Sequence, residues 1–225
     1  LATTRENQEY LPGHRLDDSI QIGLEPLPAL MDADLVFLAC PSKGLPELLK
    51  SIGPAVRGSS TKMAISLCKG LDLTTLRRPS EMMADAFGSI PVGTLSGPSN
   101  ADEVARGLPT ALVLAAITDD ALLKDVQAVV SGPTLRAYTS TDLIGVEIGG
   151  TLKNVYALGA GLCDGLGLGS NAKAAMLTRS LQEMARLGEA LGARPETFLG
   201  LGGVGDLMAT AHGSWSRNRS LGEQL

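Results

Sequence analysis

The chain has 225 residues and a net charge of −5, and 44% of its residues are hydrophobic while only 3% are aromatic. The negative charge disfavours general binding to nucleic acid, and no apolar run reaches the roughly 18 to 20 residues of a membrane span. The three cysteines lie in apolar segments, which is typical of reduced thiols in a cytoplasmic protein rather than of a disulfide framework.

Short apolar runs alternate with helical patterns through the first part of the chain. The runs predict strands at residues 35–40, 63–68, 92–95, 111–115 and 135–139. Helical spacing follows the first run at Leu45, Leu48, Leu49 and Ile52. Continuously apolar strands are buried on both faces, so the pattern predicts an α/β fold with a largely parallel, doubly wound sheet.

The pattern changes after about residue 140. Apolar residues then recur at helical spacing over 144–162, 174–191 and 198–211, without a convincing strand. We therefore predict a partial dinucleotide-binding, Rossmann-like domain at residues 1–140 and a partial all-helical, substrate-binding domain at residues 141–225. Small-molecule sites favour the cleft between two such domains.

Lys153 is the candidate catalytic residue. It lies in an apolar helical stretch in which the only other charges before Lys173 are Glu147 and Asp164. Burial disfavours an ammonium ion and lowers its pKa toward the range useful for proton transfer. The alternative is a lysine whose long stem carries the amine to the surface.

Small or polar residues follow three of the predicted strands, as Pro41-Ser42, Lys69-Gly70 and Gly97-Pro98-Ser99. Ligands in open α/β sheets bind beyond the carboxyl ends of the strands, and Lys69 lies at such an end. It is therefore a candidate ligand contact, and the alternative is a solvated lysine in a loop. The two histidines, His14 and His212, lack the spacing of metal ligands, so no metal site is predicted.

Two further clusters lie in the second half. The glycines of residues 200–206 are not preceded by a strand, so a nucleotide-binding loop is rejected there. Asp206 and Thr210 would lie on one helix face, with Asp206 as either an N-cap or the partner of Lys153. Arg217 beside Asn218 suits recognition of a phosphate or carboxylate, or forms a basic surface loop.

Together these segments resemble the NAD(P)-dependent glycerol-3-phosphate dehydrogenase family. The matching segments are YLPG at 10–13, SxxKG at 66–70, SGPSNA at 96–101, GVEIGGTLKN at 145–154, GxGxGxN at 165–171, TR with EM at 178–184, GLGGVGD at 200–206 and SRN at 216–218. The resemblance implies a two-domain dehydrogenase of the 6-phosphogluconate-dehydrogenase-like type. It would reversibly transfer hydride between NAD or NADP and dihydroxyacetone phosphate, giving sn-glycerol 3-phosphate, a precursor of glycerophospholipids.

The resemblance also implies roles for individual residues. Lys153 would be the general acid or base at the C2 oxygen, and Arg217 and Asn218 would hold the phosphate. The implied substrate-binding residues are Lys69, Gly97, Ser99, Lys153, Asn154, Asp206, Thr210, Ser216, Arg217 and Asn218. The implied cofactor-binding residues are Lys69, Ala101 and Arg217. A cytoplasmic homodimer that binds a small-molecule substrate, with no nucleic-acid partner and no membrane span, is expected.

Two alternatives remain. Hydroxy-acid dehydrogenases of the β-hydroxyacid or ketopantoate reductase type also place a lysine on the first helix after the sheet domain, but they do not usually carry the GD and SRN segments seen here. A non-catalytic binding module would have no need of Lys69, Lys153, Asp206 and Arg217 together.

The family's N-terminal strand and glycine-rich turn, which seat the pyrophosphate at a helix N-terminus, have no counterpart in this sequence. We therefore expect a fragment of the enzyme that binds NADH and NADPH weakly or not at all. Calorimetric titration of this chain with each dinucleotide measures the affinity. A micromolar Kd for either one would contradict the expectation.

Overall fold

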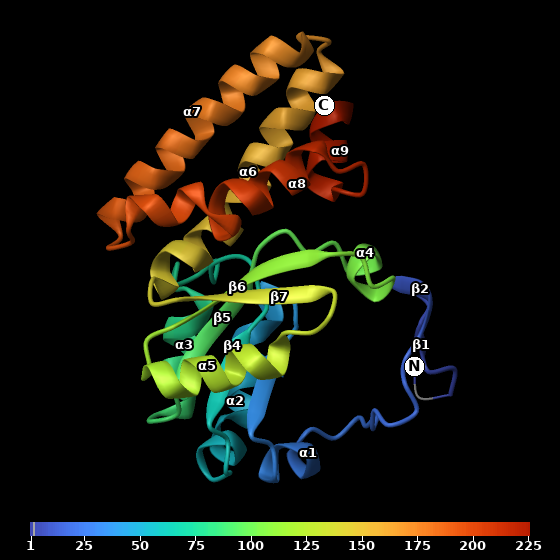
Figure 1. The fold of residues 1–225 in the computed structure, drawn as a ribbon, viewed down its shortest axis with the longest axis vertical. Coiled ribbons are helices and arrows are strands. Elements are labelled where there is room, and N and C mark those ends of the chain that lie inside the picture. The colour runs from blue at the N-terminus through green and yellow to red at the C-terminus, as the bar shows by residue number, and fades with distance from the viewer. Residues whose placement is uncertain (2) are drawn as a thin grey trace.

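The computed structural model describes residue 1 and residues 3–225. A five-stranded sheet lies below a group of helices along the long axis of the molecule (Figure 1). The strands, in their order across the sheet, are β3 (Leu35–Leu38), β4 (Met63–Ser66), β5 (Val92–Ser96), β6 (Thr110–Ala116) and β7 (Leu135–Ser140). Every strand predicted from the apolar runs is present, and the α/β fold class is confirmed.

The sheet is mixed, because β5 and β6 run antiparallel while the other three neighbouring pairs are parallel. The link between these two strands carries only α4 (Ala101–Ala105). A helix of five residues rises about 7.5 Å, whereas a strand of seven residues such as β6 spans roughly 23 Å. A parallel pair needs a crossover that brings the chain back to the end of the sheet where the first strand began. The helix α4 is too short for such a crossover, so β5 and β6 are antiparallel, contrary to the prediction.

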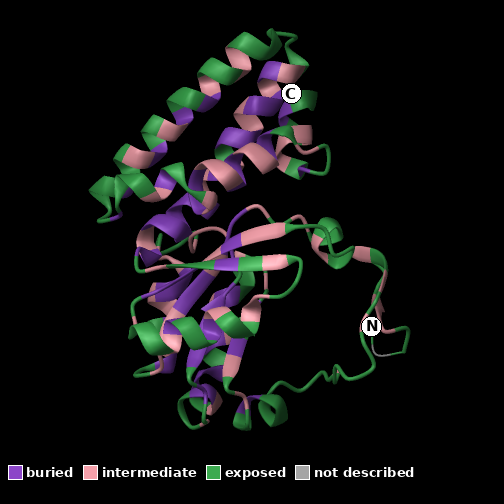
Figure 2. Ribbon diagram, in the orientation of Figure 1, coloured by how far each residue is buried: buried purple, intermediate pink, exposed green. Residues whose placement is uncertain are grey.

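Helices cover both faces of the sheet. One core holds residues of β3 with α2 (Leu45–Arg57) and α3 (Pro79–Phe87), and the other holds residues of β6 and β7 with α5 (Asp120–Val130). The central strand β4 contributes Ala64 to the first core and Ile65 to the second, since successive side chains of a strand point to opposite faces. Figure 2 shows the resulting burial of the central strands.

Short elements complete this part of the chain. They are a hairpin of β1 (Glu6–Asn7) and β2 (Leu11–Arg15), α1 (Leu27–Met31), and a 3-10 turn η1 (Ser42–Gly44). The hairpin lies beside α4 and away from the main sheet (Figure 1), where His14 Nε2 contacts Asp102 Oδ1 at 3.0 Å. The apolar runs did not predict it, because its residues are exposed or only half-buried.

The chain changes from strands to helices between Ser140 and Leu143. The long helix α6 (Leu143–Gly165) leads away from the sheet, and the other helices of this part pack on it. They are α7 (Gly169–Ala190), α8 (Asp206–His212) and α9 (Arg217–Gln224). Within the described residues, no helix has both the length and the apolar character needed to cross a bilayer.

The helix predicted over 198–211 is interrupted. A 3-10 turn η2 (Pro195–Leu199) and a π-turn η3 (Leu201–Gly205) precede α8. Glycine is a poor helix former, and a Cβ at Gly203 would overlap the backbone of Phe198. The glycines therefore permit a tight reversal that places the start of α8 against α6.

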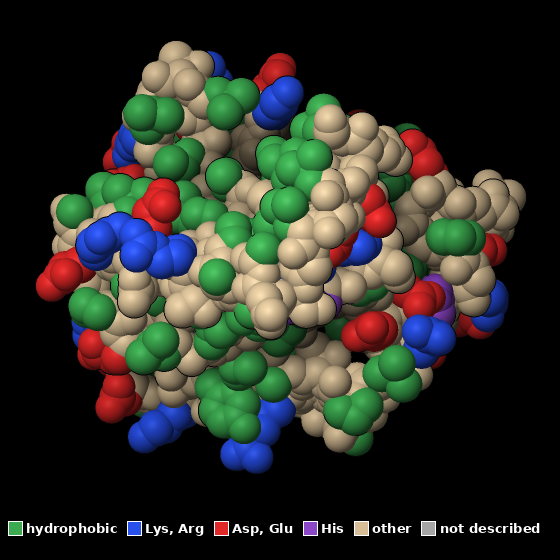
Figure 3. Space-filling view, turned by 90° about the horizontal axis from the view of Figure 1, so that it is seen from above, with side chains coloured by type: hydrophobic (Ala, Val, Ile, Leu, Met, Phe, Trp, Pro, Cys, Tyr) green, Lys and Arg blue, Asp and Glu red, His purple; other side chains and the backbone are tan. Residues whose placement is uncertain are grey.

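The molecular surface carries charges of both signs. Seen from above, Lys and Arg side chains lie among Asp and Glu side chains on the face shown in Figure 3. This mixture agrees with the small net charge of −5.

The contact between α6 and α9 depends on glycine. A Cβ at Gly161 would overlap the carbonyl oxygen of Arg219, whereas a Cβ at Gly159 would lie 3.5 Å from Met176 Sδ, an ordinary contact. We predict that Gly161→Ala lowers the free energy of unfolding by roughly 2 to 3 kcal/mol through overpacking. The control Gly159→Ala should leave it unchanged or raise it, since alanine favours helix. Urea denaturation decides, and equal stabilities for the two variants would refute the prediction.

Candidate active site

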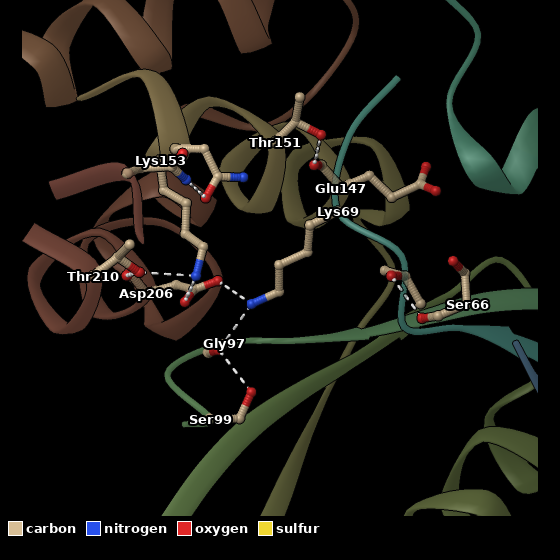
Figure 4. A network of polar contacts seen from close by, with 12 residues as sticks. Ser66, Lys69, Gly97, Ser99, Glu147, Thr151, Lys153, Asp206 and Thr210 are labelled. Carbon is tan, nitrogen blue, oxygen red and sulfur yellow. Dashed lines mark hydrogen bonds and ion pairs between the residues drawn. The ribbon is translucent and has the colours of Figure 1, made fainter. Parts of the chain in front are cut away.

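Two lysines from different parts of the fold meet one carboxylate (Figure 4). Lys69, just beyond β4, donates a hydrogen bond from Nζ to Asp206 Oδ2 at 2.6 Å. Lys153, on α6, donates from Nζ to the other oxygen, Oδ1. Asp206 is 1% exposed and Lys153 is 6% exposed. A buried carboxylate therefore bridges two ammonium groups, and Lys153 does not reach the surface along its stem.

The start of α8 explains why this carboxylate faces Lys153. Asp206 is the first residue of α8, and Thr210 lies one turn later on the same face. Lys153 Nζ also donates to Thr210 Oγ1 at 2.9 Å. Gly205 is the residue before the helix, and no side chain caps it. Of the two alternatives for Asp206, the structure therefore shows the partner of Lys153 and not an N-cap.

The pKa of Lys153 is lowered to about 8. Burial is the main cause, followed by the positive charge of Lys69, while Asp206 acts in the opposite direction. Both the protonated and the neutral form of the amine are therefore populated at pH 7 to 8. A group with this property can serve as a general acid in one direction of a reaction and as a general base in the other.

Lys69 also joins the end of β5 to the site. Its Nζ donates to the carbonyl oxygen of Gly97 at 3.2 Å, and Ser99 Oγ donates to the same oxygen at 3.2 Å. Gly97 has a φ of +138°, a conformation that side chains rarely adopt, so glycine is needed at this turn. Lys69 is held by protein groups on two sides and is not a freely solvated loop lysine.

Glycines bring α6 close to the sheet. A Cβ at Gly150 would lie 2.9 Å from Ser96 Oγ, and a Cβ at Gly149 would overlap the backbone of Gly202 in the π-turn. These two glycines thus let the end of β5 and the π-turn approach α6, and this close packing sets the position of Lys153 one turn later.

A second buried carboxylate on α6, which the sequence did not predict to have a role, contacts the start of α3. Glu147 is 5% exposed and accepts hydrogen bonds from Ser80 N at 2.8 Å, Ser80 Oγ at 2.5 Å and Arg78 Nη1 at 2.8 Å. Burial raises the pKa of Glu147, and the bonds from Ser80 and Arg78 oppose that rise. The signal in the sequence was a charge inside an otherwise apolar helix. This contact ties α6 to the start of α3.

A cleft of about 1110 Å³ opens beside Lys153. Eight of the predicted site residues line it, namely Ser99, Ala101, Lys153, Asn154, Thr210, Ser216, Arg217 and Asn218. The other three, Lys69, Gly97 and Asp206, are not on its wall but are joined to it by the hydrogen bonds described above. Ala39 and Pro41, after β3, also line the cleft, although the sequence analysis did not assign them a role.

The far wall of the cleft is the start of α9. Arg217 is its first residue and is exposed, and Asn218 Nδ2 donates to Asn154 Oδ1 at 2.9 Å. Ser216 is buried, and its hydroxyl caps the helix by accepting from Arg219 N at 3.3 Å. The hydroxyl of Ser216 is therefore used to begin α9, while Arg217 and Asn218 face the cleft.

The described part of the chain contains no group of three or more His, Cys, Asp or Glu side chains placed as metal ligands. His212 Nδ1 contacts the carbonyl oxygen of Met208 at 3.1 Å. The chemistry of the cleft rests on amines, amides, a guanidinium and a carboxylate.

This chain is similar to known proteins of one family. A family model described as NAD-dependent glycerol-3-phosphate dehydrogenase N-terminus matches residues 1–123, and the corresponding C-terminus model matches residues 142–225. A glycerol-3-phosphate dehydrogenase (NAD(P)+) of Thermus thermophilus is 50% identical, with 100% of this chain and 68% of that protein aligned. One from Nitrosomonas eutropha is 46% identical, with the same two coverages.

A solved structure shows the same fold. The crystal structure of glycerol-3-phosphate dehydrogenase from Coxiella burnetii superposes with a TM-score of 0.92 at 36% identity, and covers 100% of this chain and 69% of that one. A second structure, a glycerol-3-phosphate dehydrogenase of Plasmodium falciparum, gives a TM-score of 0.89 at 29% identity, with 99% of this chain and 62% of that one covered.

Proposed function

The chain belongs to the NAD-dependent glycerol-3-phosphate dehydrogenase family, and we propose that Lys153 is the residue that exchanges a proton with its substrate. The reaction is the reversible transfer of hydride between NAD(P)H and dihydroxyacetone phosphate, giving sn-glycerol 3-phosphate, a precursor of lipids. The enzyme class and the nicotinamide cofactor predicted from the sequence are confirmed. Family membership decides against a hydroxy-acid dehydrogenase and against a non-catalytic binding module.

The buried contact of Lys153 with Asp206, on the wall of the cleft, is the observation that carries the proposal. Hydride addition to the C2 carbon leaves negative charge on the C2 oxygen. An ammonium group beside this oxygen stabilises that charge and then donates its proton. In the reverse direction the neutral amine accepts the proton of the C2 hydroxyl. A pKa of about 8 allows Lys153 to act in both directions near neutral pH.

Asp206, Thr210 and Lys69 position this amine. Asp206 and Thr210 restrict the orientation of the Lys153 amine, because both accept hydrogen bonds from it. Lys69 lowers the pKa of Lys153 through its charge and is joined to it through Asp206. The two lysines together place positive charge where the oxyanion develops.

The phosphate group of the substrate is assigned to the start of α9. A helix N-terminus presents unpaired backbone N–H groups to an anion, and the guanidinium of Arg217 supplies charge and two parallel donors. Asn218 and Asn154, which are hydrogen-bonded to each other, lie between this end and Lys153. In this proposal the phosphate binds at the α9 end of the cleft and the reacting carbon lies near Lys153.

The residues around the cleft fit a nicotinamide dinucleotide. Ala39 and Pro41 follow the carboxyl end of β3, and Ala101 begins α4 in the link after β5. All three are small or rigid residues on the cleft wall, at the edge of the sheet where ligands of such folds bind. These residues, with Arg217, would hold the cofactor, which supplies or accepts the hydride when it is bound. The division into a cofactor domain at 1–140 and a substrate domain at 141–225, a homodimer, and a cytoplasmic location stay predictions from the sequence.

Substitution of Lys153 in the natural full-length enzyme tests the proposal. We expect Lys153→Ala to lower kcat about 10²- to 10⁴-fold, the usual contribution of a general acid or base. Lys153→Arg should also be slow, because a guanidinium keeps the charge but does not give up a proton near neutral pH. The matched control is Lys173→Ala, which removes a lysine that is paired with Asp164 outside the cleft.

Steady-state kinetics with dihydroxyacetone phosphate and NADH give kcat for each variant, and circular dichroism shows whether each one is folded. The control should keep nearly the wild-type kcat. A folded Lys153→Ala enzyme with a kcat within tenfold of the wild type would mean that another group moves the proton.

A further inference from the structure

Cys40 and Cys68 form a pair at the carboxyl ends of two neighbouring strands. In the parallel pair β3–β4, Leu38 is the partner of Ser66, so the two cysteines, each two residues further on, continue the same register. Their Sγ atoms lie 3.8 Å apart, and Cys68 Sγ is 3.0 Å from the carbonyl oxygen of Cys40. Cys68 is buried and Cys40 is half-buried, so an oxidant reaches the pair from the side of Cys40.

The backbone geometry suits a disulfide. Neighbouring strands lie about 4.8 Å apart, within the range of about 4.4 to 6.8 Å between the Cα atoms of bonded cysteines. The Sγ atoms need to approach from 3.8 Å to about 2.05 Å. The last paired residues of the ladder are Leu38 and Ser66, so side-chain rotation and small shifts beyond them can close this gap without breaking the sheet.

The position of the pair connects it to the cleft. Cys68 directly precedes Lys69, whose amine holds Asp206 at 2.6 Å. Cys40 lies between Ala39 and Pro41, and both of these line the cleft. A bond that draws the two strand ends together therefore acts on the lysine that tunes the site and on the cleft wall at β3.

We propose that Cys40 and Cys68 are a redox modification site that forms a reversible disulfide and thereby lowers turnover. In this step both Sγ–H bonds break, one Sγ–Sγ bond forms, and two protons and two electrons pass to an oxidant of the peroxide or disulfide class. The effect on turnover rests on the proposed function of the cleft, whereas formation of the bond does not.

The Cys40 thiol is mostly protonated at neutral pH. Burial, followed by the neighbouring Cys68, raises the pKa of the Cys40 thiol to about 11. The thiolate is the reactive form, so most of the pair is unreactive toward weak oxidants near pH 7. Both cysteines are free thiols in the structure, and we expect them to react with a strong oxidant rather than with a weak one.

Treatment of the reduced full-length enzyme with diamide, which accepts two electrons and two protons, tests the proposal. Mass spectrometry of the peptides identifies the linked cysteines, and the oxidation of NADH by dihydroxyacetone phosphate measures turnover. We expect a Cys40–Cys68 peptide and a loss of turnover of at least fivefold, both reversed by dithiothreitol. Cys163→Ser, at a buried free cysteine of α6, is the matched control and should respond as the wild type does.

The variants Cys40→Ser and Cys68→Ala should each keep basal turnover and lose the response to diamide. Two different positions are used so that a folding defect in one variant does not decide the test. Free thiols at both positions after treatment, a bond to Cys163, or a Cys40–Cys68 bond with unchanged turnover would each overturn the proposal. Since the bond is detected by mass, its absence is distinguishable from a failure of the proposed role of Lys153.

Discussion

The site depends on one buried carboxylate between two amines. Asp206 accepts hydrogen bonds from Lys69, at the end of β4, and from Lys153, on α6. Two ammonium groups that contact the same carboxylate repel each other, and burial raises the free energy of each charged group. The negative charge between them offsets both effects. Because the two lysines belong to the sheet and to the helical part, the same carboxylate also fixes how these parts meet at the cleft.

The balance of charges around this carboxylate explains why a buried lysine can be useful. Burial and Lys69 lower the pKa of Lys153 toward neutrality, and Asp206 keeps it from falling further. Glu147 contributes from a distance, because its contacts with Ser80 and Arg78 hold α6 in place without touching the amine. One buried carboxylate thus tunes the reactive group and the other positions the helix that carries it.

Much of this arrangement could be predicted from the sequence, and the exceptions have physical reasons. Apolar runs located all five strands of the sheet, since buried strands have a strong local signal. The direction of a strand depends on the connection that precedes it, which the apolar runs do not describe. The connection after β5 contains only the short helix α4, and β6 is antiparallel to β5. The π-turn before α8 follows from close packing of Gly203 against Phe198, a contact that local periodicity does not contain.

The residues of the site also divide into those that the sequence predicted and those that it could not predict. A charge in an apolar helix pointed to Lys153, and the spacing of Asp206 and Thr210 placed both on one face. The partners of Glu147 lie far away in the sequence, so residue patterns alone could not identify them.

The pH dependence of glycerol 3-phosphate oxidation, compared between the full-length wild type and Asp206→Asn, tests the central claim most directly. The neutral amine is the base, so the wild-type kcat should rise with pH through about 8 as Lys153 loses its proton. In the variant, burial and Lys69 still lower the pKa of Lys153 while the opposing charge is gone. The account predicts that the inflection moves to lower pH, and an inflection that is unchanged or moves to higher pH would contradict it.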